Sequence, residues 1–219
     1  MNIHYQSKIM QERDSSIKTS IELIFDPGFW ILFFHLVGNT LYESNLFFLA
    51  RLISQIGRFF TGIEIHPGAI IGKGLFIDHG HGVVIGETCE IGDNVVIYQG
   101  VTLGGTGKDT GKRHPTIGNN VLIGAGAKVL GPIKIGDNSR IGAGSVVLQE
   151  VSENSTVVGV PARSAKKTQE EVVKIYCLEH SKIADPVSIE LCMLKRKVEL
   201  LEREISQMNK GDEKINGSL

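Results

Sequence analysis

Residues 117–147 have the sequence IGNNVLIGAGAKVLGPIKIGDNSRIGAGSVV, in which an aliphatic residue returns at every sixth position. The repeated residues are Ile117, Ile123, Val129, Ile135, Ile141 and Val147. Because Ile and Val make up about a fifth of the chain, six such matches in a row arise by chance about once in ten thousand trials. A short repeat of this kind predicts a solenoid, since one unit cannot bury its apolar side alone.

The same step of six occurs earlier in the chain, at Ile65, Ile71, Ile77, Ile85, Ile91, Ile97 and Leu103. A two-residue slip at 81–84 and an insertion after Gly105 interrupt it. We expect each unit to be a short strand and a corner with its aliphatic residue inward, and three units to complete a coil stacked about 4.8 Å from the next. Gly often follows the aliphatic residue, where it would ease the backbone turn. Cys89 falls at an inward position and is expected to fill the core.

Composition narrows the class of protein. The chain has 219 residues, a formal net charge of −1 and 42% hydrophobic residues, which is typical of a globular protein and argues against nucleic-acid binding. Its three cysteines have no metal-site spacing, and the polar N-terminus lacks a signal-peptide pattern. The most apolar run, residues 29–37, is too short for a membrane span, which takes about 20 residues. We therefore expect a cytoplasmic protein with no membrane partner.

The pattern divides the chain into three regions. Residues 1–62 are expected to be helical, with a break at Pro27–Gly28, and residues 63–163 to form the β-helix. Residues 164–219 carry a heptad pattern that predicts a helix or short coiled coil, at Leu191, Leu194, Val198, Leu201, Ile205 and Met208. The predicted fold class is mainly β with α-helical ends.

Several polar residues are not required by a β-helix. Around the slip they are Glu64, His66, Asp78, His79 and His81, and in the insertion they are Lys108, Lys112, Arg113 and His114. Considered alone, a histidine at such a corner often only satisfies a backbone carbonyl, and the lysines are often solvated loop charges. For His66 a structural role is favoured.

At this point a family resemblance emerges. The run from Gly62 to Arg163 resembles the serine O-acetyltransferases of cysteine biosynthesis, members of the hexapeptide-repeat acyltransferases. The matching stretches are IDHGHGVVIGET, GVTLGGTGK, KRHPTIG, IGAGAKVLGPI, IGAGSVVL and VVGVPAR. The resemblance implies a left-handed parallel β-helix, a homotrimer that in some relatives pairs into a dimer of trimers, and acetyl transfer from acetyl-CoA to L-serine without a metal.

The resemblance also implies residue roles. His79 matches the catalytic general base, and Glu64 matches the carboxylate that orients it, although enteric members have Asp there. Asp78 and Asp14 match residues that bind the substrate ammonium, and Arg113 and His114 match the pair that receives its carboxylate. For acetyl-CoA, the matching positions are Gly105, Thr106, Ala125 and Ala143 along the pantetheine, with Lys128 and Arg140 as candidates for its phosphates.

The sequence differs from the family at two places near its N-terminus and at its C-terminal residue. Asp14 is followed by Ser15–Ser16 where relatives have Pro-Ala, and His35–Leu36 stands where many have His-Arg, which leaves open another amino alcohol acid such as homoserine as acceptor. Relatives can bind cysteine synthase through a C-terminal Ile, whereas this chain ends in Leu219, a poorer fit.

Two other classes use the same repeat. A γ-type carbonic anhydrase needs three histidines around zinc, but the position five beyond His114 is Asn119. A non-catalytic scaffold would have no use for Glu64, His79 and Arg113. Both alternatives leave the acetyltransferase motifs unexplained.

Overall fold

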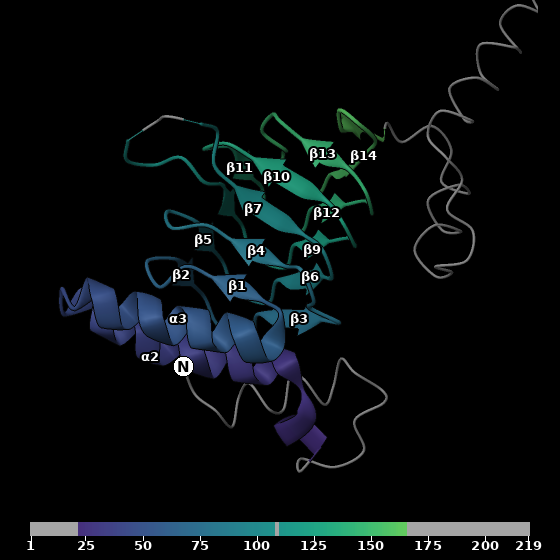
Figure 1. Ribbon diagram of the computed structural model, residues 1–219. Coiled ribbons are helices and arrows are strands. Elements are labelled where there is room, and N and C mark those ends of the chain that lie inside the picture. Colours follow the sequence, from purple (N-terminus) through teal and green to yellow (C-terminus); the bar gives the residue numbers. More distant parts are fainter. Residues whose placement is uncertain (1–21, 108–109, 166–219) are drawn as a thin grey trace, which may run out of the picture. The chain divides into compact units, whose positions relative to one another are not determined.

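The computed structural model describes residues 22–107 and 110–165. Within these residues, a 3-10 turn η1 (Glu22–Phe25) and two helices, α2 (Pro27–Glu43) and α3 (Phe47–Thr61), precede a stack of short strands (Figure 1). Asp14, Lys108 and the predicted C-terminal helix lie outside the described residues.

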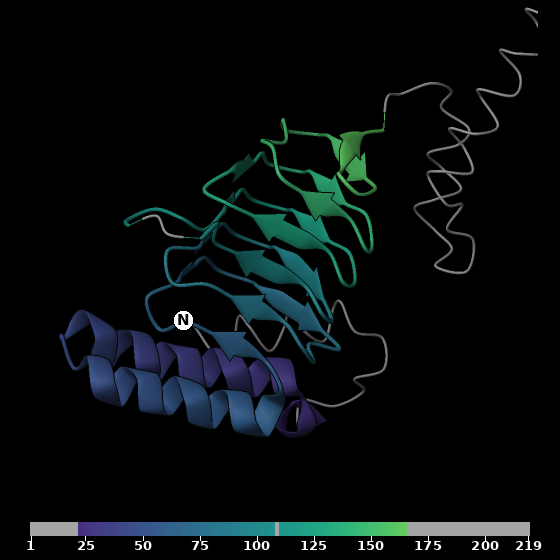
Figure 2. The same cartoon turned by 45° about the horizontal axis from the view of Figure 1, so that its top comes forward.

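The strands form three faces of a prism, which Figure 2 shows as successive coils. Face A contains β1 (Glu64–Ile65), β4 (Val84–Ile85), β7 (Thr102–Gly104), β10 (Lys128–Leu130) and β13 (Val146–Val147). Face B contains β2 (Ile70–Ile71), β5 (Glu90–Ile91), β8 (Thr116–Ile117) and β11 (Lys134–Ile135). Face C contains β3 (Phe76–Asp78), β6 (Val96–Tyr98), β9 (Leu122–Ile123), β12 (Arg140–Ile141), β14 (Thr156–Val158) and β15 (Arg163–Ser164).

The strand register confirms the repeat and both of its interruptions. Thr116 pairs with Lys134, an offset of 18 residues, as three units of six require. Across the slip the offset is 20 residues, since Glu64 pairs with Val84. Across the insertion it is 26 residues, from Thr102 to Lys128, because the extra residues form a loop that leaves the coil. The strands pair in parallel, apart from β15, which turns back on β14.

The predicted inward residues form the core. Twelve of the thirteen aliphatic repeat residues are at most 3% exposed, and Ile71 is half-buried in the first coil. Cys89 is buried among them, and burial raises the pKa of its thiol to about 12, as expected of a core residue. Parallel strands that each bury one side chain against two other faces give a continuous apolar column.

The reason for the glycine after each aliphatic residue differs from the expected one. The left-handed backbone positions occur two residues later, for example at Asn120 with φ 54° and Gly126 with φ 71°. Gly124, by contrast, is needed because a Cβ there would lie 2.6 Å from the amide nitrogen of Ala143 on the next coil. The prediction of a turn-forming glycine at this position was therefore wrong, because close stacking is what excludes a side chain.

The helices cover the first coil of the prism. Asp26 caps α2 by accepting a hydrogen bond from the amide of Phe29 at 2.7 Å, and the predicted break near Pro27–Gly28 lies at this cap, between the 3-10 turn η1 and α2. A second break, which the sequence did not indicate, separates α2 from α3 at residues 44–46, where Asn45 adopts φ 61°. Ile31 and Leu32 of α2 join the core of the β-helix.

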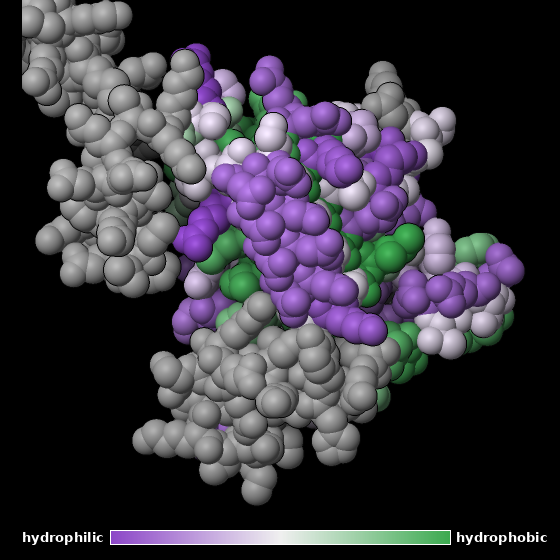
Figure 3. Space-filling model, turned by 180° about the vertical axis from the view of Figure 1, so that it is seen from behind, coloured by the Kyte–Doolittle hydropathy of each residue, from purple (hydrophilic) through white to green (hydrophobic). Residues whose placement is uncertain are grey.

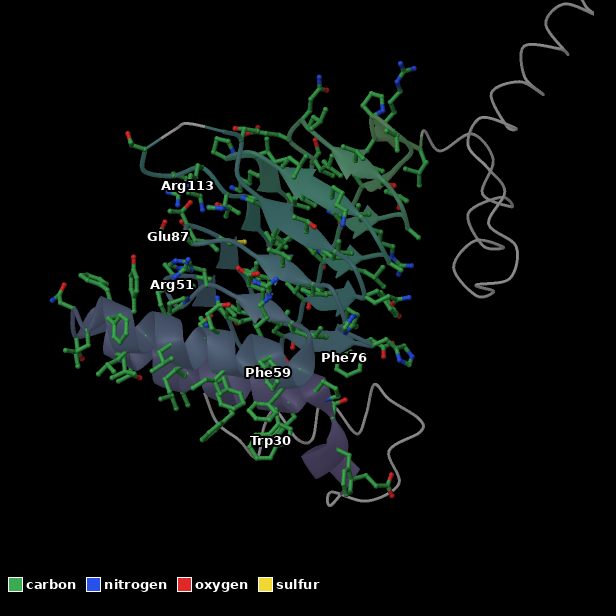
Figure 4. All side chains as sticks on the ribbon, in the orientation of Figure 1. Trp30, Arg51, Phe59, Phe76, Glu87 and Arg113 are labelled. Carbon is green, nitrogen blue, oxygen red and sulfur yellow. The ribbon has the colours of Figure 1, made fainter. Side chains whose placement is uncertain are left out.

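The outer surfaces of the two parts differ in polarity. Viewed from the side opposite to Figure 1, hydrophilic residues form a continuous band over the β-helix (Figure 3). The helices instead expose large apolar side chains, among them Phe25, Phe48, Phe59 and Phe60. Trp30 projects from the side of the helix pair that faces away from the strands (Figure 4).

Candidate functional site

The predicted site residues lie at two different edges of the prism. The corner that joins face C to face A, here the C–A edge, carries His79, His81, Ala125 and Ala143. The corner that joins face A to face B, here the A–B edge, carries Gly105, Thr106, Arg113 and His114. One face of about six residues separates the edges, which at 3.3 Å per residue is up to about 20 Å. Within one chain, His79 and Arg113 are therefore not neighbours.

His79 is an exposed polar residue of the C–A edge. Its side chain is 81% exposed, and its backbone has φ 50°, a left-handed conformation that is unusual for a residue with a side chain. Its Nε2 lies 3.7 Å from Oδ1 of Asp78, the last residue of β3. Such backbone strain often accompanies a functional side chain, since the fold holds the residue at a corner where it projects outward.

Glu64 begins the first coil, at the start of β1, and His79 lies in the corner that ends this coil. The register partner of Glu64 is Val84, and the corner 79–83 leads directly into that strand. Within the described chain, the Glu64 carboxylate pairs with Arg58 of α3 at 3.0 Å and does not contact His79. The ring of His81 packs over Gly62, where a Cβ would collide with it.

Small residues continue the C–A edge beyond His79. The amide of Gly144 donates to the carbonyl of Ala125 at 2.8 Å, and the amide of Gly126 donates to that of Gln99 at the same distance. Positions where Cβ atoms of Gly126 and Gly144 would stand are open, so an extended ligand can approach the backbone closely.

Two basic residues flank this edge. Lys128 on face A donates to the carbonyl oxygen of Gly100 and to Oγ1 of Thr102, the latter at 3.0 Å. Arg140 is exposed at the start of β12 on face C. To bind a phosphate of acetyl-CoA, Lys128 would have to break its hydrogen bonds to Gly100 and Thr102.

The A–B edge holds Arg113 and His114 in a bonded network. Arg113 donates through Nη2 to Oε2 of Glu87, and the hydroxyl of Tyr42 in α2 donates to Oε1 of the same carboxylate at 3.0 Å. The Arg113 guanidinium lowers the pKa of Glu87, and the resulting carboxylate raises the pKa of Tyr42. Arg113 and Glu87 lie one above the other along this edge in Figure 4.

Thr88 orients His114. The amide of Thr88 donates to Nδ1 of His114 at 3.2 Å, so in the neutral ring Nδ1 is the acceptor and Nε2 carries the proton. Burial lowers the pKa of His114, which favours that neutral ring. Its Nε2 lies beside Gly86 and Gly105, positions where a Cβ would crowd the ring. The A–B edge thus holds a buried neutral N–H donor beside the half-buried Arg113.

The sequence alone did not reveal three of these residues. Glu87 and Thr88 stand in the matched stretch IGET, and the only signal for them was two polar residues in a corner that the repeat does not require. Nothing in the sequence connected Tyr42 to the insertion. Lys112 is not simply a solvated loop residue, because its ammonium group donates hydrogen bonds to the carbonyl of Thr88 at 2.7 Å and to Glu90 at 2.9 Å.

Two further observations concern the other classes of protein considered from the sequence. Among residues 22–107 and 110–165, no three His, Cys, Asp or Glu side chains are grouped so that they could hold a metal ion. In the same residues, no helix combines the length and the apolar character needed to cross a membrane.

Comparison with known proteins identifies the family. Residues 114–149 match the family model described as bacterial transferase hexapeptide (six repeats). The chain is 56% identical to serine acetyltransferase of Staphylococcus aureus (strain Mu50) over 193 residues, which is 88% of this chain and 90% of that protein.

Solved structures agree in fold. Neisseria gonorrhoeae serine acetyltransferase in complex with serine is 41% identical, with a TM-score of 0.71 over 74% of this chain and 67% of that one. The Brucella abortus enzyme in complex with coenzyme A is 43% identical, with a TM-score of 0.72 over 74% of this chain and 66% of that one. The match confirms the left-handed β-helix that the family resemblance implied, and by its sequence this chain belongs to the serine acetyltransferases, a family of acyltransferases.

Proposed function

We propose that the chain transfers the acetyl group of acetyl-CoA to the hydroxyl of L-serine, giving O-acetylserine and CoA for cysteine biosynthesis. The observation that carries the proposal is the C–A edge, where the exposed His79 stands in line with an accessible track of small residues. An acceptor hydroxyl bound at His79 would then lie next to the thioester of an acetyl-CoA that is bound along these small residues. The chemistry is proposed to reside in residues 63–163, between a helical region of residues 1–62 and a tail of residues 164–219.

His79 acts as the general base in this proposal. Its neutral imidazole takes the proton from the serine hydroxyl as that oxygen forms a bond to the thioester carbonyl carbon. The tetrahedral intermediate then breaks its carbon–sulfur bond, and the imidazolium returns the proton to the departing thiolate. In the proposal, Glu64, at the start of the same coil, turns toward His79 from its pair with Arg58 and stabilises the imidazolium.

The remaining charges suit a zwitterionic acceptor. Asp78, beside His79, binds the ammonium group, and Asp14 is proposed to share it. Arg113 and His114 bind the carboxylate, because a guanidinium and a neutral N–H donor both match its oxygens. A sugar acceptor would leave these charges unpaired.

Because these residues lie at separate edges, the proposed site needs two copies of the chain. The C–A edge of one subunit supplies His79 and Asp78, and the A–B edge of a neighbour supplies Arg113 and His114. We propose that this contact closes into the homotrimer that the family resemblance implies, and the exposed apolar residues of α2 and α3 suit pairing of two trimers.

Acetyl-CoA would lie in the same groove between subunits. Ala125 and Ala143 line it on one side, and Gly105 and Thr106 of the neighbour line it on the other. Lys128 and Arg140, which flank the C–A edge, are proposed to bind its phosphates, Lys128 after it leaves its contacts with Gly100 and Thr102. The enzyme is proposed to be cytoplasmic and to bind cysteine synthase through its C-terminal residues, which end in Leu219; truncation of those residues would then abolish co-elution of the two proteins.

The test is to follow free CoA thiol from acetyl-CoA with serine, homoserine, threonine and a set of sugars as acceptors. We expect a strong preference for serine and a loss of about a hundredfold or more in kcat for His79→Ala, the range of a general base. Preference for homoserine would redirect the proposal to another amino alcohol acid. A folded wild type that releases no thiol with any acceptor would refute it.

A further inference from the structure

We infer that Tyr42 and Glu87 are positioning residues that hold Arg113 ready for the acceptor carboxylate, so that helix α2 takes part in substrate binding. The inference rests on the proposed function, in which Arg113 binds that carboxylate. It gives Tyr42 and Glu87 a role in substrate binding. Tyr42 belongs to α2, and neither α2 nor α3 contains a proposed catalytic residue. The three side chains form a relay, Tyr42–Glu87–Arg113, from the helix to the inserted loop.

The pair at the end of the relay is well suited to orient a guanidinium. Glu87 and Arg113 have 30% exposed side chains, so the contact is partly screened from water. In the described chain the guanidinium is engaged by a side chain through Nη2 alone, which leaves its other donors for a ligand. A long arginine side chain otherwise loses much rotamer freedom when it binds, and fixing it beforehand reduces that cost to affinity.

Tyr42 fixes the carboxylate that fixes the arginine. Its hydroxyl donates to Oε1 of Glu87, the oxygen that Arg113 does not use. The ring is held edge-on by Phe47 and His66, with centroids 5.1 and 5.8 Å away. It also lies over Gly68, where a Cβ would approach it to 3.1 Å. A rigid aromatic ring with one polar tip can therefore define the position of Glu87 with little loss of its own freedom.

Thr88 supports the same arrangement from the backbone. Its Oγ1 accepts the amides of Arg113 at 3.0 Å and of His114 at 3.1 Å, so both residues start from a fixed main chain. The side chains of Tyr42 and Glu87 then decide where the guanidinium points. Because these contacts are present without substrate, their removal should weaken serine binding and leave the acetyl-transfer step intact.

The test compares Tyr42→Phe, Glu87→Gln and the double variant with the wild type in steady-state kinetics. We expect the KM for serine to rise about tenfold in Glu87→Gln and about threefold in Tyr42→Phe, with kcat and the KM for acetyl-CoA within about twofold. The double variant should match Glu87→Gln, because Tyr42 acts only through that carboxylate. Thr88→Val should also raise the serine KM, and Thr88→Ser, which keeps the hydroxyl, should restore it.

Glu90→Gln is the matched control, since it removes the ion pair to Lys112 on the same loop and leaves the relay intact. It should change the serine KM by less than about twofold. An unchanged serine KM in Glu87→Gln, equal changes in both KM values, or independent effects in the double variant would overturn the inference.

Calorimetric titration with serine separates this inference from the proposed function. A wild type that does not turn over serine would refute the function, and the relay would then be judged by binding alone. Serine binding about tenfold weaker in Glu87→Gln would support the relay, whereas unchanged binding, or no binding by the wild type, would overturn it.

Discussion

His35 is a residue of α2 whose ring lies against the first coil, within hydrogen-bond reach of the Ala69 backbone. Burial lowers its pKa from 6.5 to about 4; a backbone hydrogen bond with Ala69 opposes the shift, and the nearby His66 adds to it. Among the described residues, its Nδ1 has no hydrogen-bond partner. Burial is also the main cause that lowers the pKa of the half-buried His66 to about 4. Both rings fold as neutral groups, so protonation opposes the folded state.

This burial predicts acid sensitivity in a defined window. The unfolded state binds protons at pH 6.5 and the folded state only near pH 4, so the stabilisation is complete above about pH 6.5 and is lost as the pH falls toward 4. His35 alone accounts for at most about 3 kcal/mol of the decrease in the free energy of unfolding over this pH range. His35→Phe keeps an apolar ring and should flatten the pH dependence of the unfolding free energy, measured by urea denaturation from pH 7 to pH 4. An equally steep dependence in the variant would show that other groups cause it.

At the scale of the element, close stacking of coils decides which residues the repeat accepts. Gly124 has an ordinary backbone conformation but faces the backbone of Ala143, whereas Gly144 has φ 67° and open space where a Cβ would stand. Gly124 is thus required because a side chain would be too crowded, and Gly144 because its backbone is left-handed. Substitutions at the two positions therefore measure these two effects separately.

Alanine at each position should therefore destabilise the protein to a different extent. We expect Gly124→Ala to lower the unfolding free energy by about 3 kcal/mol, because coils must move apart to admit the methyl group. Gly144→Ala should cost about 1 kcal/mol, the penalty of a left-handed residue with a side chain. Urea titrations of the two variants measure the difference, and a larger loss for Gly144→Ala would mean that turn geometry, not stacking, dominates.

For the whole molecule, the separation of the two edges makes the assembly part of the proposed site. If His79 and Arg113 come from different subunits, two inactive variants can repair each other. We expect His79→Ala and Arg113→Ala to be nearly inactive when pure. After they are mixed in denaturant and refolded together, each interface has a one-in-four chance of receiving both intact edges, so activity should return to about a quarter of the wild-type value. Separate refolding of each variant is the control, and a mixture that stays inactive would place the site within one chain.

The sequence by itself determined the period, the inward residues and the two interruptions of the β-helix, because each unit of six meets the same local demand to bury one aliphatic side chain. It also predicts site roles for His79 and Arg113, through motifs that the repeat does not need. Only the tertiary structure decided that these residues occupy different edges, since the edge depends on how the slip and the insertion shift later coils. The contact of Tyr42 with Glu87 joins residues 45 positions apart, and no local pattern encodes it. It arises because α2 packs on the first coil and ends beside the A–B edge.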